Sequence, residues 1–175
     1  MYEYISGSLT ELSPTYAVVE AAAKVVAAGA RYDKMRYSYQ EYFERMHSDL
    51  SWGKPLAALL GALKMQVELG LPSIGGKDSM SGTFQDINVP PMLMAFGITT
   101  VDARTVISPE LKAAGNKLYL IKHTPKANYM PDVEQLKENF SAVSSAIEQG
   151  KILSGYAIGF GGVAEAVAKM SFGNM

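Results

Sequence analysis

A short polar loop follows two adjacent glycines in the middle of the chain, and it carries the residues best suited to chemistry. Gly75 and Gly76 lack a Cβ and tolerate positive φ, so another group can approach their backbone closely. The residues that follow supply a cation, an anion and two hydroxyls within one turn: Lys77, Asp78, Ser79 and Ser81. This set suits a phosphate or a metal-bound phosphate, and a solvated β-turn is the alternative that remains open.

The loop differs from the P-loop, G-x-x-x-x-G-K-[ST], at two points. Gly70 and Gly76 have one residue too many between them, and Asp78 stands where a P-loop places the hydroxyl that binds Mg²⁺. The chain then runs through Thr83 to a Pro pair rather than opening a helix. The pattern therefore excludes a P-loop.

The elements around this loop predict a strand, a helix and two further strands. Alternating apolar and polar residues over 35–40 predict a half-buried strand. Residues 55–69 predict a helix, which Gly70 ends, with one apolar stripe: Leu56, Leu59, Leu60, Leu63 and Val67. A short buried strand then leads into the loop, and residues 92–99 predict a strand buried on both faces.

The two ends of the chain predict further helices. Ser13 and Pro14 have the pattern of a helix N-cap and first turn, and Gly29 fits the C′ position. Residues 117–122 predict a strand, 131–149 an amphipathic helix, and a last helix starts near Gly162. Gly161 and Gly162 at that start indicate an anion site, because helix N-termini offer free N–H groups, and tight packing is the alternative. We expect a domain boundary near residue 105.

Composition excludes several classes of function. The chain has 175 residues, 48% of them hydrophobic, with a net charge of −1 and no basic tract. We therefore expect no nucleic-acid or membrane partner. The absence of cysteine excludes disulfides, cysteine–zinc sites and a cysteine nucleophile, and it agrees with a cytoplasmic location.

Three stretches resemble formylglycinamide ribonucleotide amidotransferase, also called phosphoribosylformylglycinamidine synthase. "PSIGGKDSMS" is similar to the GKDSMS segment of that family, "PPMLMAFGITTVDARTVISPELKAAGNKLYLIKH" to the strands of its second synthetase-like half, and "GFGGVAEAVAKMSFGN" to its following Gly-Gly helix. The resemblance implies an α+β, aminoimidazole ribonucleotide synthetase-like fold with a mixed sheet. Residues 1–105 would belong to an N-terminal-like domain and 106–175 to an incomplete C-terminal-like domain.

The resemblance also implies an activity and its cofactors. The family is an ATP-dependent carbon–nitrogen ligase of purine biosynthesis, with glutamine as the amide donor and Mg²⁺ beside the ATP or ADP. The chain would be an internal piece, inactive by itself, whose partners are the first synthetase-like half and a glutaminase domain. We also expect the isolated piece to self-associate, because a truncated sheet leaves apolar strands unpaired.

Residue by residue, the resemblance implies nucleotide contacts at Gly75, Gly76, Lys77, Gly161 and Gly162 and substrate-phosphate contacts at Ser79 and Ser81. Glu20 matches a Mg²⁺ ligand of the family, and Asp78 is the nearby carboxylate that could assist it. Lys24 and Ala157 stand where the family has further oxygen ligands, so we expect weak or undetectable binding of Mg-ADP.

Two alternatives remain open from the residues. The chain could be a non-catalytic module with a degenerate nucleotide site, as Lys24 and Ala157 suggest. It could also come from another member of the superfamily, such as a selenophosphate synthetase or a thiamine phosphate kinase, although the KDSMS string argues against both.

Overall fold

The computed structural model describes residues 14–172, which form two compact units with interleaved segments. Residues 14–21 and 36–98 make one unit, here called the sheet unit. Residues 22–35 and 99–172 make the other, here called the helical unit. Helix α1 (Pro14–Ala27) contributes its first half to the sheet unit and its second half to the helical unit. In this part of the chain the sheet unit ends at residue 98 and the helical unit begins at residue 99. The predicted domain boundary near residue 105 stays a prediction.

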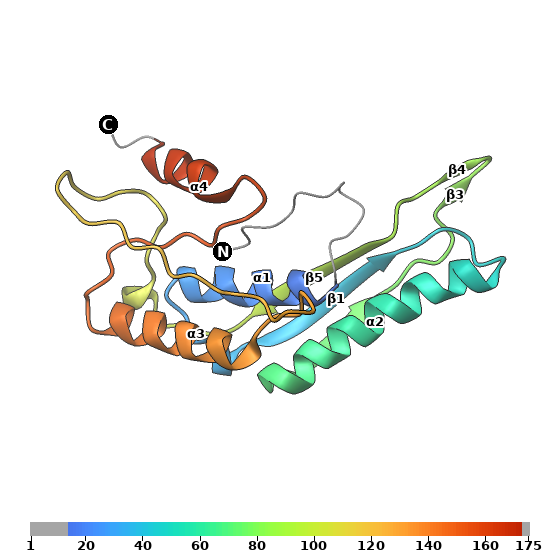
Figure 1. Ribbon diagram of the computed structural model, residues 1–175, viewed down its shortest axis with the longest axis horizontal. Helices are drawn as coiled ribbons and strands as arrows, with labels where there is room; N and C mark the ends of the chain where they lie inside the picture. Colours follow the sequence, from blue (N-terminus) through green and yellow to red (C-terminus); the bar gives the residue numbers. More distant parts are fainter. Residues whose placement is uncertain (1–13, 173–175) are drawn as a thin grey trace. The chain divides into compact units, whose positions relative to one another are not determined.

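The sheet unit is built on three strands in the order β2-β1-β5 (Figure 1). Strand β1 (Arg36–Tyr42) is parallel to β2 (Ser73–Lys77) and antiparallel to β5 (Met92–Ile98). Helix α2 (Asp49–Leu69) connects the parallel pair. A small hairpin of β3 (Thr83–Phe84) and β4 (Ile87–Asn88) precedes β5. This mixed sheet with helices confirms the predicted α+β class.

Local chemistry explains where α2 begins and ends. Ser48 and Ser51 form a capping box, in which each side chain accepts a hydrogen bond from the other residue's backbone N–H. Gly70 closes the helix with φ of 72°, a left-handed conformation that glycine adopts without strain. The predicted helix end at Gly70 is confirmed, and the helix begins six residues earlier than predicted, at Asp49 rather than Pro55.

The buried face of α2 differs from its predicted apolar stripe. Small and flexible side chains face the core, namely those of Ala58, Ala62, Met65 and Leu69. The leucine stripe lies on the opposite side, with Leu56, Leu59, Leu60 and Leu63 between 50% and 58% exposed and Val67 71% exposed. Alanine on the core side lets the helix backbone approach its neighbours closely, whereas a row of leucines would hold it away.

Two strand predictions were right about the strand and wrong about its burial. Every residue of β2 is exposed, and no residue of β5 is fully buried. Both are edge strands of a three-stranded sheet, so neither has neighbours on both sides. Strand β1 lies between them, and Tyr37 is fully buried as predicted, its hydroxyl donating to the Val18 carbonyl at 3.0 Å.

The helical unit holds the second half of α1, α3 (Val133–Glu148), α4 (Gly162–Ser171) and two one-turn 3-10 helices, η1 (Tyr32–Lys34) and η2 (Ala103–Thr105). After α1, Gly29 has φ of 99° and its N–H donates to Val26, while Ala30 donates to Val25. This Schellman motif confirms Gly29 as C′, and Pro14 opens the helix as predicted. Ser13 lies outside the described residues.

Helix α3 confirms its prediction, and its buried side includes Val133, Leu136, Phe140 and Ile147. Residues 117–122 form no strand, so that prediction was wrong. Leu118 and Tyr119 are 58% and 81% exposed, and no described strand pairs with this segment. None of the helices within residues 14–172 is long and apolar enough to cross a membrane.

Candidate functional site

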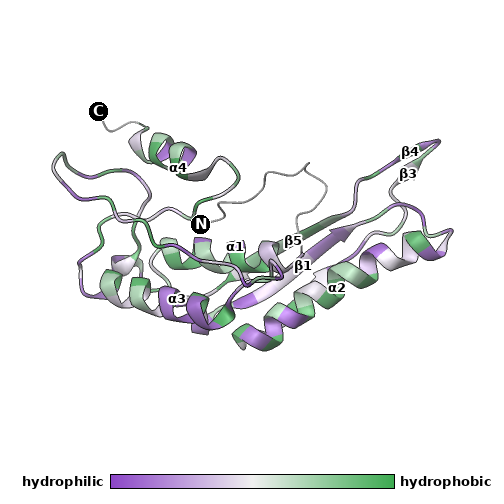
Figure 2. Ribbon diagram, in the orientation of Figure 1, coloured by the Kyte–Doolittle hydropathy of each residue, from purple (hydrophilic) through white to green (hydrophobic). Residues whose placement is uncertain are grey.

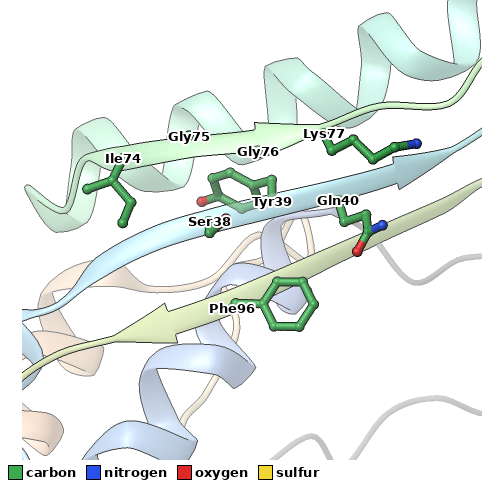
Figure 3. A pocket seen from close by; sticks show the side chains of 8 residues that line it. All are labelled: Ser38, Tyr39, Gln40, Ile74, Gly75, Gly76, Lys77 and Phe96. Atoms are coloured by element: carbon green, nitrogen blue, oxygen red, sulfur yellow. The ribbon is translucent and has the colours of Figure 1, made fainter.

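The sheet unit has a hollow of about 400 Å³ on the open side of its three strands (Figure 3). Helix α2 and the first half of α1 lie behind the sheet in this view. Strand β2 lines the hollow with Ile74, Gly75, Gly76 and Lys77. Strands β1 and β5 complete the lining with Ser38, Tyr39, Gln40 and Phe96. The structure therefore brings three predicted residues, Gly75, Gly76 and Lys77, into one concave surface.

Gly76 is required by the packing of two strands. A Cβ at this position would lie 2.5 Å from the Tyr39 carbonyl oxygen, which is too close for any real contact. The close approach that the glycine pair predicted is thus an approach to β1. Gly75 differs, because a Cβ there would meet no atom within 4 Å. Its side of the hollow is open to a ligand.

Lys77 supplies the positive charge of the hollow. Its ammonium lies 5.7 Å from the centre of the Tyr42 ring and donates to the Asp78 carbonyl at 3.2 Å. The side-chain amide of Gln40, directly opposite Lys77 in the parallel register, donates to the Tyr42 hydroxyl. A cation and an amide beside an open glycine can bind an anionic group such as a phosphate.

The loop after β2 continues the parallel ladder. The Ser79 N–H donates to the Glu41 carbonyl at 3.0 Å, and the Phe43 N–H donates to the Ser79 carbonyl at 2.8 Å. Further on, the Ser81 carbonyl accepts from the Thr83 N–H at 2.8 Å. Ser79 and Ser81 do not line the hollow, so their predicted substrate-phosphate role stays a prediction.

Two carboxylates stand at the carboxyl end of the parallel pair, where the ribbon of β1 is hydrophilic (Figure 2). Glu41 is 4% exposed, and its Oε1 has no hydrogen-bond partner. Burial, followed by the negative charge of Asp78, raises the pKa of the Glu41 carboxyl. Burial also raises the pKa of the nearby Tyr39 hydroxyl, which likewise has no partner. Nothing in the local sequence around Glu41 marked it as unusual.

The predicted anion site at the start of α4 belongs to the helical unit, and an internal carboxylate occupies it. The Gly161 N–H donates to Glu165 Oε2 at 2.7 Å, and Glu165 forms an ion pair with Lys169. Both interactions, the ion pair being the larger, lower the pKa of Glu165. A phosphate at this helix start would have to compete with the chain's own carboxylate for Gly161, while the role of Gly162 stays a prediction.

The predicted metal ligands Glu20 and Asp78 both belong to the sheet unit, Glu20 on α1 and Asp78 after β2. Within residues 14–172, no group of three or more His, Asp and Glu side chains is arranged to hold a metal ion. Mg²⁺ bound with a nucleotide uses as few as one or two protein carboxylates, so the assignment of these ligands stays a prediction.

Sequence reasoning missed the parts of the hollow that other strands contribute: Ser38, Gln40 and Phe96. The alternation over residues 35–40 identified a strand, and it carried no information about which strands would flank it. The register that places Phe96 and Gly75 beside Ser38 arises only in the folded sheet.

A three-stranded mixed sheet with a βαβ unit and a following hairpin defines an α+β fold. No protein-family profile and no curated protein matches the chain. Among solved structures, phosphoribosylformylglycinamidine synthase II of Thermotoga maritima is similar, with a TM-score of 0.64 and 20% identity over 89% of this chain. T. maritima PurL complexed with AMPPCP gives 0.59 and 18% over 91%, and PurL complexed with ADP gives 0.58 and 15% over 91%.

These likenesses establish the fold, which is that of part of PurL. The chain spans only about a quarter of each neighbour, between 25% and 27% of its length.

Proposed function

We propose that the chain is a piece of an ATP-dependent carbon–nitrogen ligase of purine biosynthesis, the enzyme that converts formylglycinamide ribonucleotide, ATP and glutamine to formylglycinamidine ribonucleotide. The fold of PurL over 89% of the chain supports this proposal together with the GKDSMS resemblance. In the whole enzyme, the first synthetase-like half and a glutaminase domain would be its partners in the cytoplasm.

The observation that carries the proposal is the position of Gly75, Gly76 and Lys77 on one hollow. Lys77 would neutralise a phosphate of ATP or ADP, and open Gly75 would admit the phosphate to the backbone. Asp78 follows β2, and the hydrogen bonds of Ser79 continue the ladder past it, so we expect its side chain on the other side of the sheet from Lys77. The hollow itself therefore offers no carboxylate for Mg²⁺, and its phosphate contact does not require the metal.

Ligand-observed NMR and calorimetry with ADP test this proposal on the 175-residue chain. We expect weak binding, with a dissociation constant on the order of 1 mM, that does not change when Mg²⁺ is added. Lys77→Met should weaken it several-fold. Lys64→Met removes an exposed lysine that pairs with Glu68 on α2, so it is the matched control and should bind as the wild type does.

Two results would count against the proposal. The absence of any saturation transfer at several millimolar ADP would remove the nucleotide role of the hollow. A low-micromolar dissociation constant that depends on Mg²⁺ would also contradict the proposal. It would show that the loss of oxygen ligands at Lys24 and Ala157 does not weaken Mg-ADP binding.

The second candidate function is a non-catalytic module that packs against the rest of the parent enzyme. The Glu165 carboxylate at Gly161 favours it, since it fills one of the two predicted phosphate sites. Lys77→Met in the complete enzyme separates the candidates. A raised KM for ATP supports the nucleotide role, and unchanged kinetics support the module.

A further inference from the structure

The unexplained feature of the sheet unit is the pair of carboxylates at the end of β1 and β2. Gln40 lies opposite Lys77 in the register, and the hydrogen bonds of Ser79 to Glu41 and Phe43 extend the same ladder by two residues. Glu41 therefore lies directly opposite Asp78. Both side chains leave the sheet on the same side, which is the opposite side from the hollow.

This arrangement is electrostatically unfavourable for the chain alone. Like charges directly opposite each other in a sheet destabilise it, and a buried carboxylate needs a partner. The Glu41 residue is only 4% exposed, and its Oε1 accepts no hydrogen bond. Among the described residues, no Lys or Arg forms an ion pair with Glu41 or Asp78. The nearby Lys54 is already paired with Glu44.

Three properties of the position favour a bound cation. Two carboxylates lie opposite each other at the end of one ladder, one of them has an oxygen without a hydrogen-bond partner, and Asp78 is exposed to solvent. Ligands of sheets with parallel strands bind beyond the carboxyl ends of those strands, which is where this pair lies. Divalent cations such as Mg²⁺ and Mn²⁺ accept one or two protein carboxylates and complete their coordination with water.

We propose that Glu41 and Asp78 together bind one divalent cation at the carboxyl end of the β1–β2 pair. The site uses Glu41 in place of Glu20, the residue that the family resemblance assigns. It lies across the sheet from Lys77 and does not depend on the proposed nucleotide function.

Titration of the 175-residue chain with Mn²⁺, followed by loss of the free-ion electron paramagnetic resonance signal, tests the site. We expect one Mn²⁺ per chain. Glu41→Gln and Asp78→Asn should each raise its dissociation constant at least tenfold, because each variant replaces one of two charged ligands with a neutral amide of the same shape. Asp86→Asn, which alters an exposed carboxylate in the β3–β4 turn, should leave the constant unchanged.

The thermal midpoint of unfolding gives a second readout that also controls for folding. Mn²⁺ should raise the midpoint of the wild type and of Asp86→Asn, and it should raise that of Glu41→Gln and Asp78→Asn little or not at all. The proposal is overturned if the wild type binds no Mn²⁺ at millimolar concentration, or if both ligand variants bind it as the wild type does. It is also overturned if Mn²⁺ raises the midpoint of Glu41→Gln as much as it raises that of the wild type.

Discussion

The sequence suggested that Gly76 lets a ligand approach the backbone, whereas the structure requires a glycine at this position because β1 lies close to it. The GGK sequence suggested a backbone that a ligand approaches, and the glycine with open space beside it in the hollow is Gly75. At Gly76 the close neighbour is the Tyr39 carbonyl of β1. Sequence alone could not separate the two glycines, because their roles depend on which side of the strand meets another chain segment.

Gly76→Ala should destabilise the sheet unit by about 1–3 kcal/mol, because the added methyl group must push β2 away from β1. Urea unfolding followed by the fluorescence of Trp52, the single tryptophan, measures this within the sheet unit. Gly53→Ala is the matched control, since a Cβ there meets no atom and alanine favours the helix. A Gly76→Ala protein as stable as Gly53→Ala would contradict the packing explanation.

Helices were predicted more completely than strands, and α2 shows the limit even for helices. Apolar residues recur with the helical period on two opposite faces of α2. The period therefore predicted the helix correctly and could not identify which of the two faces is buried. The structure places the alanine face against the core and leaves the leucine stripe exposed. A strand needs a partner, and the strand prediction for residues 117–122 was wrong because no described strand pairs with that segment.

The start of α3 depends on a buried histidine, and this gives the helix a dependence on pH. His123 is 7% exposed, and its Nε2 accepts from the N–H of Asp132, the N-cap residue of α3. Burial lowers the pKa of His123. The unfolded chain therefore binds a proton more readily than the folded chain does.

Stability of the helical unit should accordingly fall as pH is lowered below about 6.5, the ordinary pKa of histidine in an unfolded chain. Amide hydrogen exchange of α3 between pH 5 and 7.5, corrected for the intrinsic rate, measures the effect. His123→Gln keeps an acceptor for Asp132 and should reduce this fall, whereas His47→Gln, at an exposed histidine, should retain it. An equal fall in wild type and His123→Gln would assign it to other groups.

At the scale of the whole molecule, exposed apolar side chains gather on α2 and on the edge strand β5. Figure 2 shows β5 as a hydrophobic ribbon. A helix that is apolar on two sides is ordinarily covered on both. An exposed apolar surface of this kind promotes association in solution.

We therefore expect the isolated chain to form dimers or larger species in sedimentation experiments over a concentration series. Leu59→Lys with Leu63→Glu should shift the distribution toward monomer and leave the unfolding midpoint nearly unchanged, because both side chains are at least half exposed. Ala62→Lys would unfold the sheet unit instead, since Ala62 is buried. A wild-type chain that is monomeric at high micromolar concentration would contradict the expectation.

The interleaving of the two units affects the order in which the chain can fold during synthesis. Residues 36–98 are continuous, so most of the sheet unit can form soon after it leaves the ribosome. The Ala30 carbonyl, in contrast, accepts its hydrogen bond from Ser144, 114 residues later. At about 5–20 residues per second this partner arrives roughly 6–23 s afterwards. During that interval the segment that follows α1 can contact residues 105–107 and lacks the contacts of α3, which completes its packing.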